Sequence, residues 1–98
     1  MKHSIHILAL GLGLLVISAP AHAACYADYK AKKDSPLKLH YGVARIPDSS
    51  CGSRRAAAQA IAPRLASSGW TLLNIVSVFE DAGLNGRKAN AGSFFLRY

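Results

Sequence analysis

A short apolar run near the start of the chain ends at small residues, and it limits how much sequence is left to fold. Residues 7–17 are all apolar or Gly, and they are followed by Pro20 and then by Ala21-His22-Ala23. A charged start, a short apolar run and a small-x-small site form the pattern of a secretory signal peptide. We therefore predict that residues 1–23 are a cleaved signal peptide, with Ala21 and Ala23 read by the peptidase.

Two other interpretations of this segment fit less well. A membrane-spanning helix needs about 20 apolar residues, whereas the uninterrupted run here has 11. Lipid attachment at Cys25 would require Leu or a similar residue three positions earlier, where the chain has His22. No second apolar run of spanning length follows, so we expect no membrane span after cleavage and a protein that is periplasmic or secreted.

Cleavage after Ala23 leaves residues 24–98, which are 75 of the 98 residues. A chain of this length forms one small domain with a modest core. In an oxidising compartment its two cysteines, Cys25 and Cys51, predict one structural disulfide. Closing a loop of roughly 25 residues should stabilise the fold by about 3–4 kcal/mol. The alternative is a reactive Cys51 thiolate at a helix start, but a redox pair usually has the Cys-x-x-Cys spacing, which is missing here.

The exported part divides into an N-terminal segment, residues 24–36, and a small domain, residues 37–98. The segment is polar and charged, and it ends at the turn signal Asp34-Ser35-Pro36. Residues 37–46 then alternate, which predicts a strand with one buried face. The buried side of this strand is expected to hold Leu37, Leu39, Tyr41 and Val43, and the polar side Lys38, His40, Gly42 and Ala44.

Residues 53–68 are predicted to form a helix because they are rich in Ala. Ala57 or Ala58, Ile61 and Leu65 fall on one apolar stripe. Ser49, Ser50 or Ser53 is the expected N-cap, and Gly69 the expected stop. Pro63 cannot donate a backbone hydrogen bond, so we expect a kink there, or a short break before the last turn.

Residues 70–79 are rich in apolar and β-branched side chains at both odd and even positions, as in a central strand that is covered on both faces. Residues 80–92 are expected to be a polar connection with a turn at Asn85-Gly86, and residues 93–98 a short aromatic strand. The predicted order is therefore β-α-β-β, an α+β sandwich of two layers. Its first two strands would be parallel if they are neighbours.

The run Gly69-Trp70-Thr71-Leu72-Leu73-Asn74-Ile75-Val76-Ser77-Val78, followed by Phe94-Phe95-Leu96-Arg97-Tyr98, resembles part of a bacterial family. This family consists of small domains of unknown function with a Gly-Trp-x-Leu-x-x-Val strand and an aromatic C-terminal strand. The likeness covers roughly residues 38–98, and Thr71 stands where these domains usually have Glu. The exported part also resembles short exported alphaproteobacterial proteins described only as hypothetical. Both resemblances imply a fold and no activity.

The sequence offers little for catalysis. His40 is the only histidine after residue 23, and a lone histidine on the polar face of a strand is usually solvated. Glu80-Asp81 is the only acidic pair, and neighbouring side chains usually point apart. A metal site needs three or four ligands in a suitable spacing, and neither this nor a phosphate-binding loop or nucleophile elbow is present. We therefore predict no catalytic residues, no cofactor, no metal and no enzyme activity.

The net charge is +7, and it becomes +6 when Lys2 leaves with the signal peptide. Such a charge favours anionic partners, although it also serves solubility alone. The densest group of cations, and the candidate anion-binding site, is Lys30, Lys32, Lys33 and Lys38. Two functions are favoured: a non-catalytic periplasmic accessory or interaction domain with a protein partner, or a cationic envelope-binding protein for an anionic polymer or lipid. A small hydrolase that uses His40 is a third and weaker option.

Overall fold

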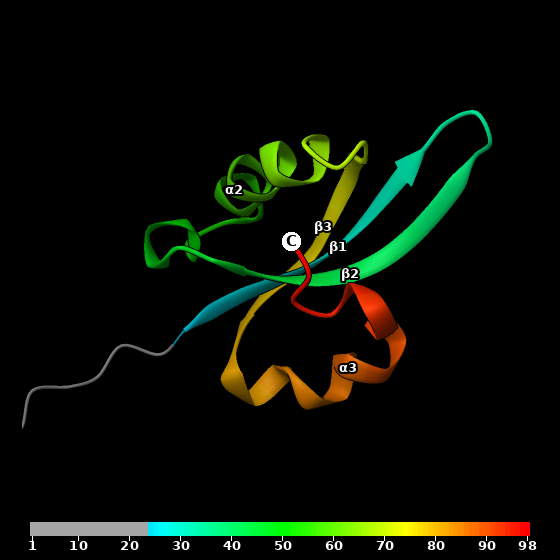
Figure 1. Ribbon diagram of the computed structural model, residues 1–98. Coiled ribbons are helices and arrows are strands. Elements are labelled where there is room, and N and C mark those ends of the chain that lie inside the picture. The colour runs from blue at the N-terminus through cyan, green and yellow to red at the C-terminus, as the bar shows by residue number, and fades with distance from the viewer. Residues whose placement is uncertain (1–23) are drawn as a thin grey trace, which may run out of the picture.

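The computed structural model describes residues 24–98, which form one antiparallel sheet with a helix on each face (Figure 1). The α+β class is confirmed. The signal-peptide prediction, with Ala21 and Ala23, concerns residues outside this described part. No helix within residues 24–98 is long and apolar enough to cross a membrane. The elements are β1 (Cys25–Lys33), β2 (Lys38–Ile46), η1 (Asp48–Ser50), α2 (Arg54–Ala66), β3 (Thr71–Glu80), η2 (Asp81–Gly83), α3 (Asn85–Ala91) and η3 (Gly92–Phe94).

The sheet has the order β2-β1-β3, so the first strand lies in the centre. Sequence reasoning missed this strand because its lysines and Asp28 hide the apolar pattern, and it treated residues 24–36 as a segment outside the domain. Both outer strands are antiparallel to β1. The expectation of a central strand at residues 70–79 was therefore wrong, since β3 is an edge strand. β2 and β3, which were expected to be parallel if they were neighbours, are separated by β1 and do not pair.

The C-terminal quarter also differs from the prediction. Residues 80–92 are not a plain connection, because Asn85 and Gly86 begin helix α3. The expected strand at residues 93–98 is wrong as well: a single parallel bridge joins Phe95 to Val43, and the backbone φ of Leu96 is +56°, which an extended strand cannot contain. The chain order is therefore β-β-α-β-α and not β-α-β-β, and the sheet is covered from both sides.

Helix α2 matches its prediction closely. The Ser53 hydroxyl accepts a hydrogen bond from the Ala56 N–H at 3.0 Å, so Ser53 is the N-cap. The predicted stripe is buried, with Ala57, Ile61 and Leu65 all fully enclosed. The helix continues through Pro63 to Ala66 without a break. It is closed by Gly69, whose φ is +82°, and by the Trp70 N–H, which donates to the Leu65 carbonyl at 3.0 Å.

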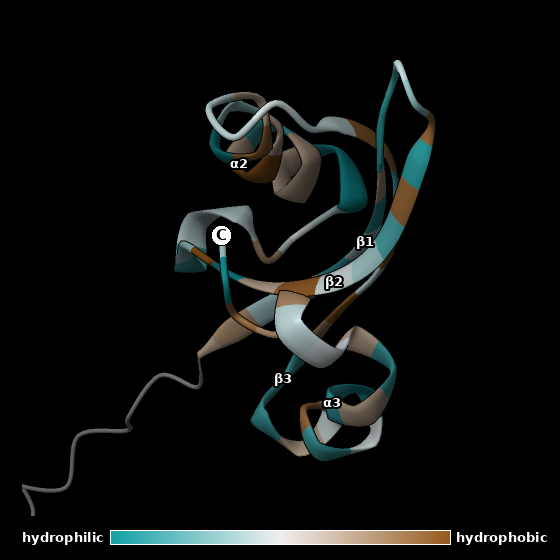
Figure 2. Ribbon diagram, turned by 45° about the vertical axis from the view of Figure 1, so that its right-hand side comes forward, coloured by the Kyte–Doolittle hydropathy of each residue, from teal (hydrophilic) through white to brown (hydrophobic). Residues whose placement is uncertain are grey.

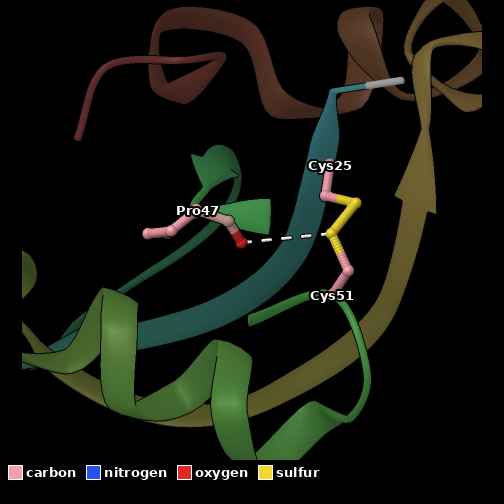
Figure 3. Close-up of a disulfide and its surroundings, with 3 residues drawn as sticks. All are labelled: Cys25, Pro47 and Cys51. Carbon is pink, nitrogen blue, oxygen red and sulfur yellow. Dashed lines mark hydrogen bonds between the residues drawn. A yellow bond between two sulfur atoms is a disulfide. The ribbon is translucent and has the colours of Figure 1, made fainter. Parts of the chain in front are cut away.

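The predicted disulfide between Cys25 and Cys51 is confirmed, with a Cα–Cα distance of 5.9 Å (Figure 3). It ties the first residue of the central strand to the loop before α2. The Cys51 Sγ lies 3.9 Å from the Pro47 carbonyl oxygen. Because a bonded sulfur carries no hydrogen, this is a packing contact. Reactive-thiol chemistry at Cys51 is therefore ruled out in this oxidised form.

Candidate functional site

The predicted anion-binding lysines lie on the β1–β2 hairpin, but strand alternation separates them onto two faces. Lys30 and Lys32 share one face of β1. Lys33 lies on the other face, with its Nζ 4.7 Å from the centre of the Trp70 ring, and its cross-strand partner Lys38 shares that face. Lys32 also forms an exposed ion pair with Asp34 at 3.3 Å. The four residues are therefore not one binding site.

The face that holds Lys30 and Lys32 is only half covered. Helix α3 has seven residues, and its buried Ala91 packs with Tyr26 and Val43 at the inner end of the sheet. We call the outer part of the β1–β2 hairpin, residues 30–41, the arm; its tip, beyond the last pairing with β3 at Lys32 and Thr71, projects from the body of the molecule (Figure 1). Its side chains there are exposed: Leu39 keeps 66% of its surface, and Leu37 at the tip keeps 65%. A sheet face that buries one end and exposes leucines at the other is a candidate binding surface.

This exposed surface contains a groove of about 320 Å³. Leu73, which lies in a bulged part of β3 and is 49% exposed, forms one wall opposite Leu39. We define the arm face as Lys30, Lys32, Leu39, Tyr41 and Leu73. Figure 2 shows the alternation of polar and apolar residues along this part of the hairpin. The arm face therefore combines apolar side chains with cations, which suits an amphipathic anionic partner better than a purely polar one.

Tyr41 connects the groove to a buried polar network. Its hydroxyl donates to Asp28 at 2.8 Å, while Ser77 donates to the same carboxylate at 2.6 Å and the Arg87 Nε at 3.1 Å. Burial and the bond to Asp28 raise the pKa of Tyr41 to about 12. Burial alone would raise the pKa of Asp28, but the three hydrogen bonds and the Arg87 charge lower it below its usual value.

The Asp28 network fastens α3 to the sheet. Arg87, on α3, also donates to the Gly83 carbonyl at 2.7 Å, and its guanidinium lies 3.8 Å from the centre of the Phe79 ring. All of these groups are already engaged with each other. Asp28 accepts three hydrogen bonds and is therefore a structural anion, held in place by groups of the protein itself.

His40 is not the solvated side chain that the sequence predicted. It is only 9% exposed, and its Nε2 lies 2.9 Å from the Tyr29 hydroxyl. Its ring stacks on Phe94 at 3.7 Å and meets the Trp70 ring edge-on at 4.2 Å. Burial, and then the positive charges of Arg97 and Lys33, lower the pKa of His40 below 6.5. The histidine belongs to an aromatic cluster beneath the opposite face of the sheet, so it has a packing role.

One group of potential metal ligands lies within the described residues, and it consists of Cys25, Asp48 and Cys51. The two sulfurs are bonded to each other in the disulfide. Metals bind cysteine as the thiolate, so this cluster holds no metal while the bond is intact.

The residues that sequence reasoning missed are the exposed leucines and Tyr41. The alternation placed Leu37 and Leu39 on the buried side, and the structure reverses this because α3 stops short of them. The available signal was the run from Lys30 to Tyr41, which contains four lysines and two leucines.

Comparisons of the whole chain with protein-family models, curated proteins and solved structures found no match. The resemblance to small bacterial domains of unknown function therefore stays a prediction. The aromatic final strand that it implied is not formed, since only Phe95 makes a bridge.

Proposed function

We propose that this chain is a non-catalytic interaction domain that works outside the cytoplasm and binds its partner with the arm face. The observation that carries the proposal is the uncovered outer half of the sheet. There Leu39 of the arm and Leu73 of β3 line a groove beside Lys30. Small proteins rarely leave leucines this exposed together, and such patches usually mark interaction sites.

The test is site-specific photo-crosslinking in living cells. A photoreactive residue replaces Leu39 on the arm face, and the matched control replaces Arg55, which is exposed on α2 on the other side of the sheet. We expect adducts from position 39 and none of comparable yield from position 55. Equal labelling from both positions, or none from either, would remove the proposal.

The extracytoplasmic location is supported by the Cys25–Cys51 disulfide, because such bonds persist mainly in oxidising compartments. Export through residues 1–23 is the remaining step of this proposal. Intact mass of the protein recovered from cells, with and without reduction before alkylation, checks both points together. We expect a mass for residues 24–98 and no alkylation until reduction. Retention of residues 1–23, an added lipid or two free thiols would contradict the proposal.

A second candidate is a cationic envelope-binding protein for an anionic polymer or lipid. It is favoured by Lys30 and Lys32, which lie on the same surface as the leucines. Binding of this kind must weaken steeply with salt. The double variant Lys30→Gln, Lys32→Gln should weaken it, whereas Arg54→Gln, Arg55→Gln removes the same charge from α2 and should not. Salt-independent binding would exclude this candidate.

A further inference from the structure

We infer that the partner of the arm face is an anionic lipid bilayer, with the leucines entering the interface and the lysines contacting phosphate groups. This inference rests on the proposed binding role of the arm face and names the partner. In this inference residues 24–98 dock on the surface of a membrane and do not cross it.

The exposed leucines lie at and near the tip of the arm. Leu37 lies at the tip of the arm, one residue before β2, and Leu39 and Leu73 follow on the arm face. All three are about half or more exposed. Because the tip of the arm projects from the body (Figure 1), Leu37 and Leu39 can enter the boundary between head groups and acyl chains while the domain stays in water, with Leu73 of β3 beside them in the groove.

The charges around the leucines are complementary to an anionic lipid surface. Residues 30–41 contain one acid, Asp34, and four lysines, of which Lys30 and Lys32 lie on the arm face and Lys33 and Lys38 on the other face. That acid is already paired with Lys32 at 3.3 Å. Lys30 lies in the groove wall beside Leu39 and Leu73, where its amine can contact a phosphate while the leucines contact acyl chains. Cations within a Debye length of an anionic bilayer each add to its binding.

The shape favours a bilayer over a protein or a polymer. A stable protein interface buries about 800 Å² on each partner. Beyond the last pairing with β3, at Lys32 and Thr71, the hairpin is two-stranded and offers little flat area. An anionic polymer would be held by charge alone and gives no reason to expose Leu37 and Leu39. An anionic lipid surface uses both the leucines and the lysines, the first at the acyl chains and the second at the phosphates.

The experiment measures vesicle co-sedimentation of the protein as it is recovered from cells. One set of vesicles contains phosphatidylglycerol and phosphatidylcholine, and the other contains phosphatidylcholine alone. We expect binding to the anionic vesicles to be about 25-fold stronger or more, since Lys30 and Lys32 alone should contribute that much. The variant Lys30→Gln, Lys32→Gln should lose about 25-fold, at roughly fivefold per lysine near the surface. Leu37→Ser, Leu39→Ser should lose about tenfold.

The matched control is Arg54→Gln, Arg55→Gln, which has the same charge change at the start of α2 on the other face of the sheet. It should stay within about twofold of the unmodified protein. All variants change exposed or half-exposed residues, and their thermal unfolding is measured alongside to confirm the fold. Equal loss in the control and the lysine variant, or equal binding to both vesicles, would overturn the inference.

Failure of the inference and failure of the proposed function give different results. If vesicles do not bind but the photoreactive residue at position 39 labels a protein in cells, the lipid partner is wrong and the interaction domain stands. If vesicles do not bind and position 39 labels nothing, both are wrong. Vesicle binding that needs both Leu39 and Lys30 supports the two together.

Discussion

The two faces of the sheet are built in different ways. The face under α2 is apolar and closed, with Ala27, Tyr29 and Ala31 of β1 all fully buried against the helix. The face under α3 is half polar, because its inner end is fastened by the Asp28–Arg87 network and its outer end is open. One face therefore supplies most of the hydrophobic stabilisation, while the other is free to present a binding surface.

The largest expected effect tests this division directly. Ile61→Ala on α2 removes a fully buried side chain from the closed face, so it should lower the free energy of unfolding by about 3 kcal/mol, within the usual range of about 2–5. Leu39→Ala on the arm face should change it by less than about 0.5 kcal/mol, because Leu39 is exposed. Urea titrations of both variants check the comparison. Similar losses would mean that Leu39 is packed and the arm face is not open.

The second prediction compares two acids that form ion pairs. Asp28→Asn breaks a buried pair and should cost about 2–3 kcal/mol, reduced from the fully buried case because Arg87 keeps some exposure. Asp34→Asn breaks the exposed pair with Lys32 and should cost less than about 0.5 kcal/mol. Thermal or urea unfolding at neutral pH measures both.

The Asp28 effect should also depend on pH. Its pKa is lower in the folded protein than the ordinary value of 3.8, so the unfolded chain binds a proton first. The stability from this carboxylate is therefore present above pH 3.8 and is lost as the pH falls through the folded pKa. The difference between wild type and Asp28→Asn should shrink in strong acid. A difference that stays constant would show that the charge of Asp28 does not contribute.

The sequence alone predicts which side chains share a face of the sheet or helix, but not which face is covered. The two-residue alternation of residues 37–46 correctly sorted side chains onto two faces, and the Ala57, Ile61 and Leu65 stripe correctly identified the buried side of α2. Which face of β2 is covered at each point depends on where α2 and α3 end in space. For that reason His40 was expected in water and is buried, while Leu39 was expected in the core and is exposed.

The missed central strand has a related cause. Asp28 can be buried in β1 because its carboxylate accepts hydrogen bonds from Ser77, Tyr41 and Arg87. These three partners come from distant segments, so no local sequence pattern could predict them. The disulfide was predictable, because only two cysteines are available to pair. The candidate site was half predictable: the lysines are visible in the sequence, but their separation onto two faces requires the strand register.

The third prediction concerns a close approach inside the closed face. Gly42 lies opposite Tyr29 in the sheet, and a Cβ at that position would lie 2.5 Å from the Tyr29 hydroxyl oxygen. Tyr29 is fully buried, and its hydroxyl lies 2.9 Å from the His40 Nε2. Gly42→Ala should therefore cost about 1–3 kcal/mol through overpacking. Gly52→Ala, with no atom within 4 Å of its added Cβ, is the control and should have little effect on urea unfolding.

The smallest expected effect is a pH dependence that belongs to the closed face alone. His40 is held in an aromatic cluster with Tyr29, Trp70, Phe94 and Tyr98, and the charged groups that face it are Lys33 and Arg97. Both charges are positive, so the cluster favours the neutral imidazole and lowers the pKa of His40 below 6.5. The unfolded chain then binds the proton more readily than the folded one.

Stability should consequently be highest above pH 6.5 and should fall as the pH drops below 6.5, levelling off below the folded pKa. His40→Phe retains an aromatic ring but leaves the Tyr29 hydroxyl without its partner, so it should be less stable at every pH. Its urea midpoint should nevertheless be flat between pH 8 and pH 5, where the wild-type midpoint declines. A decline of equal size in both proteins would assign the dependence to another group, and it would remove the closed face as the source of acid sensitivity.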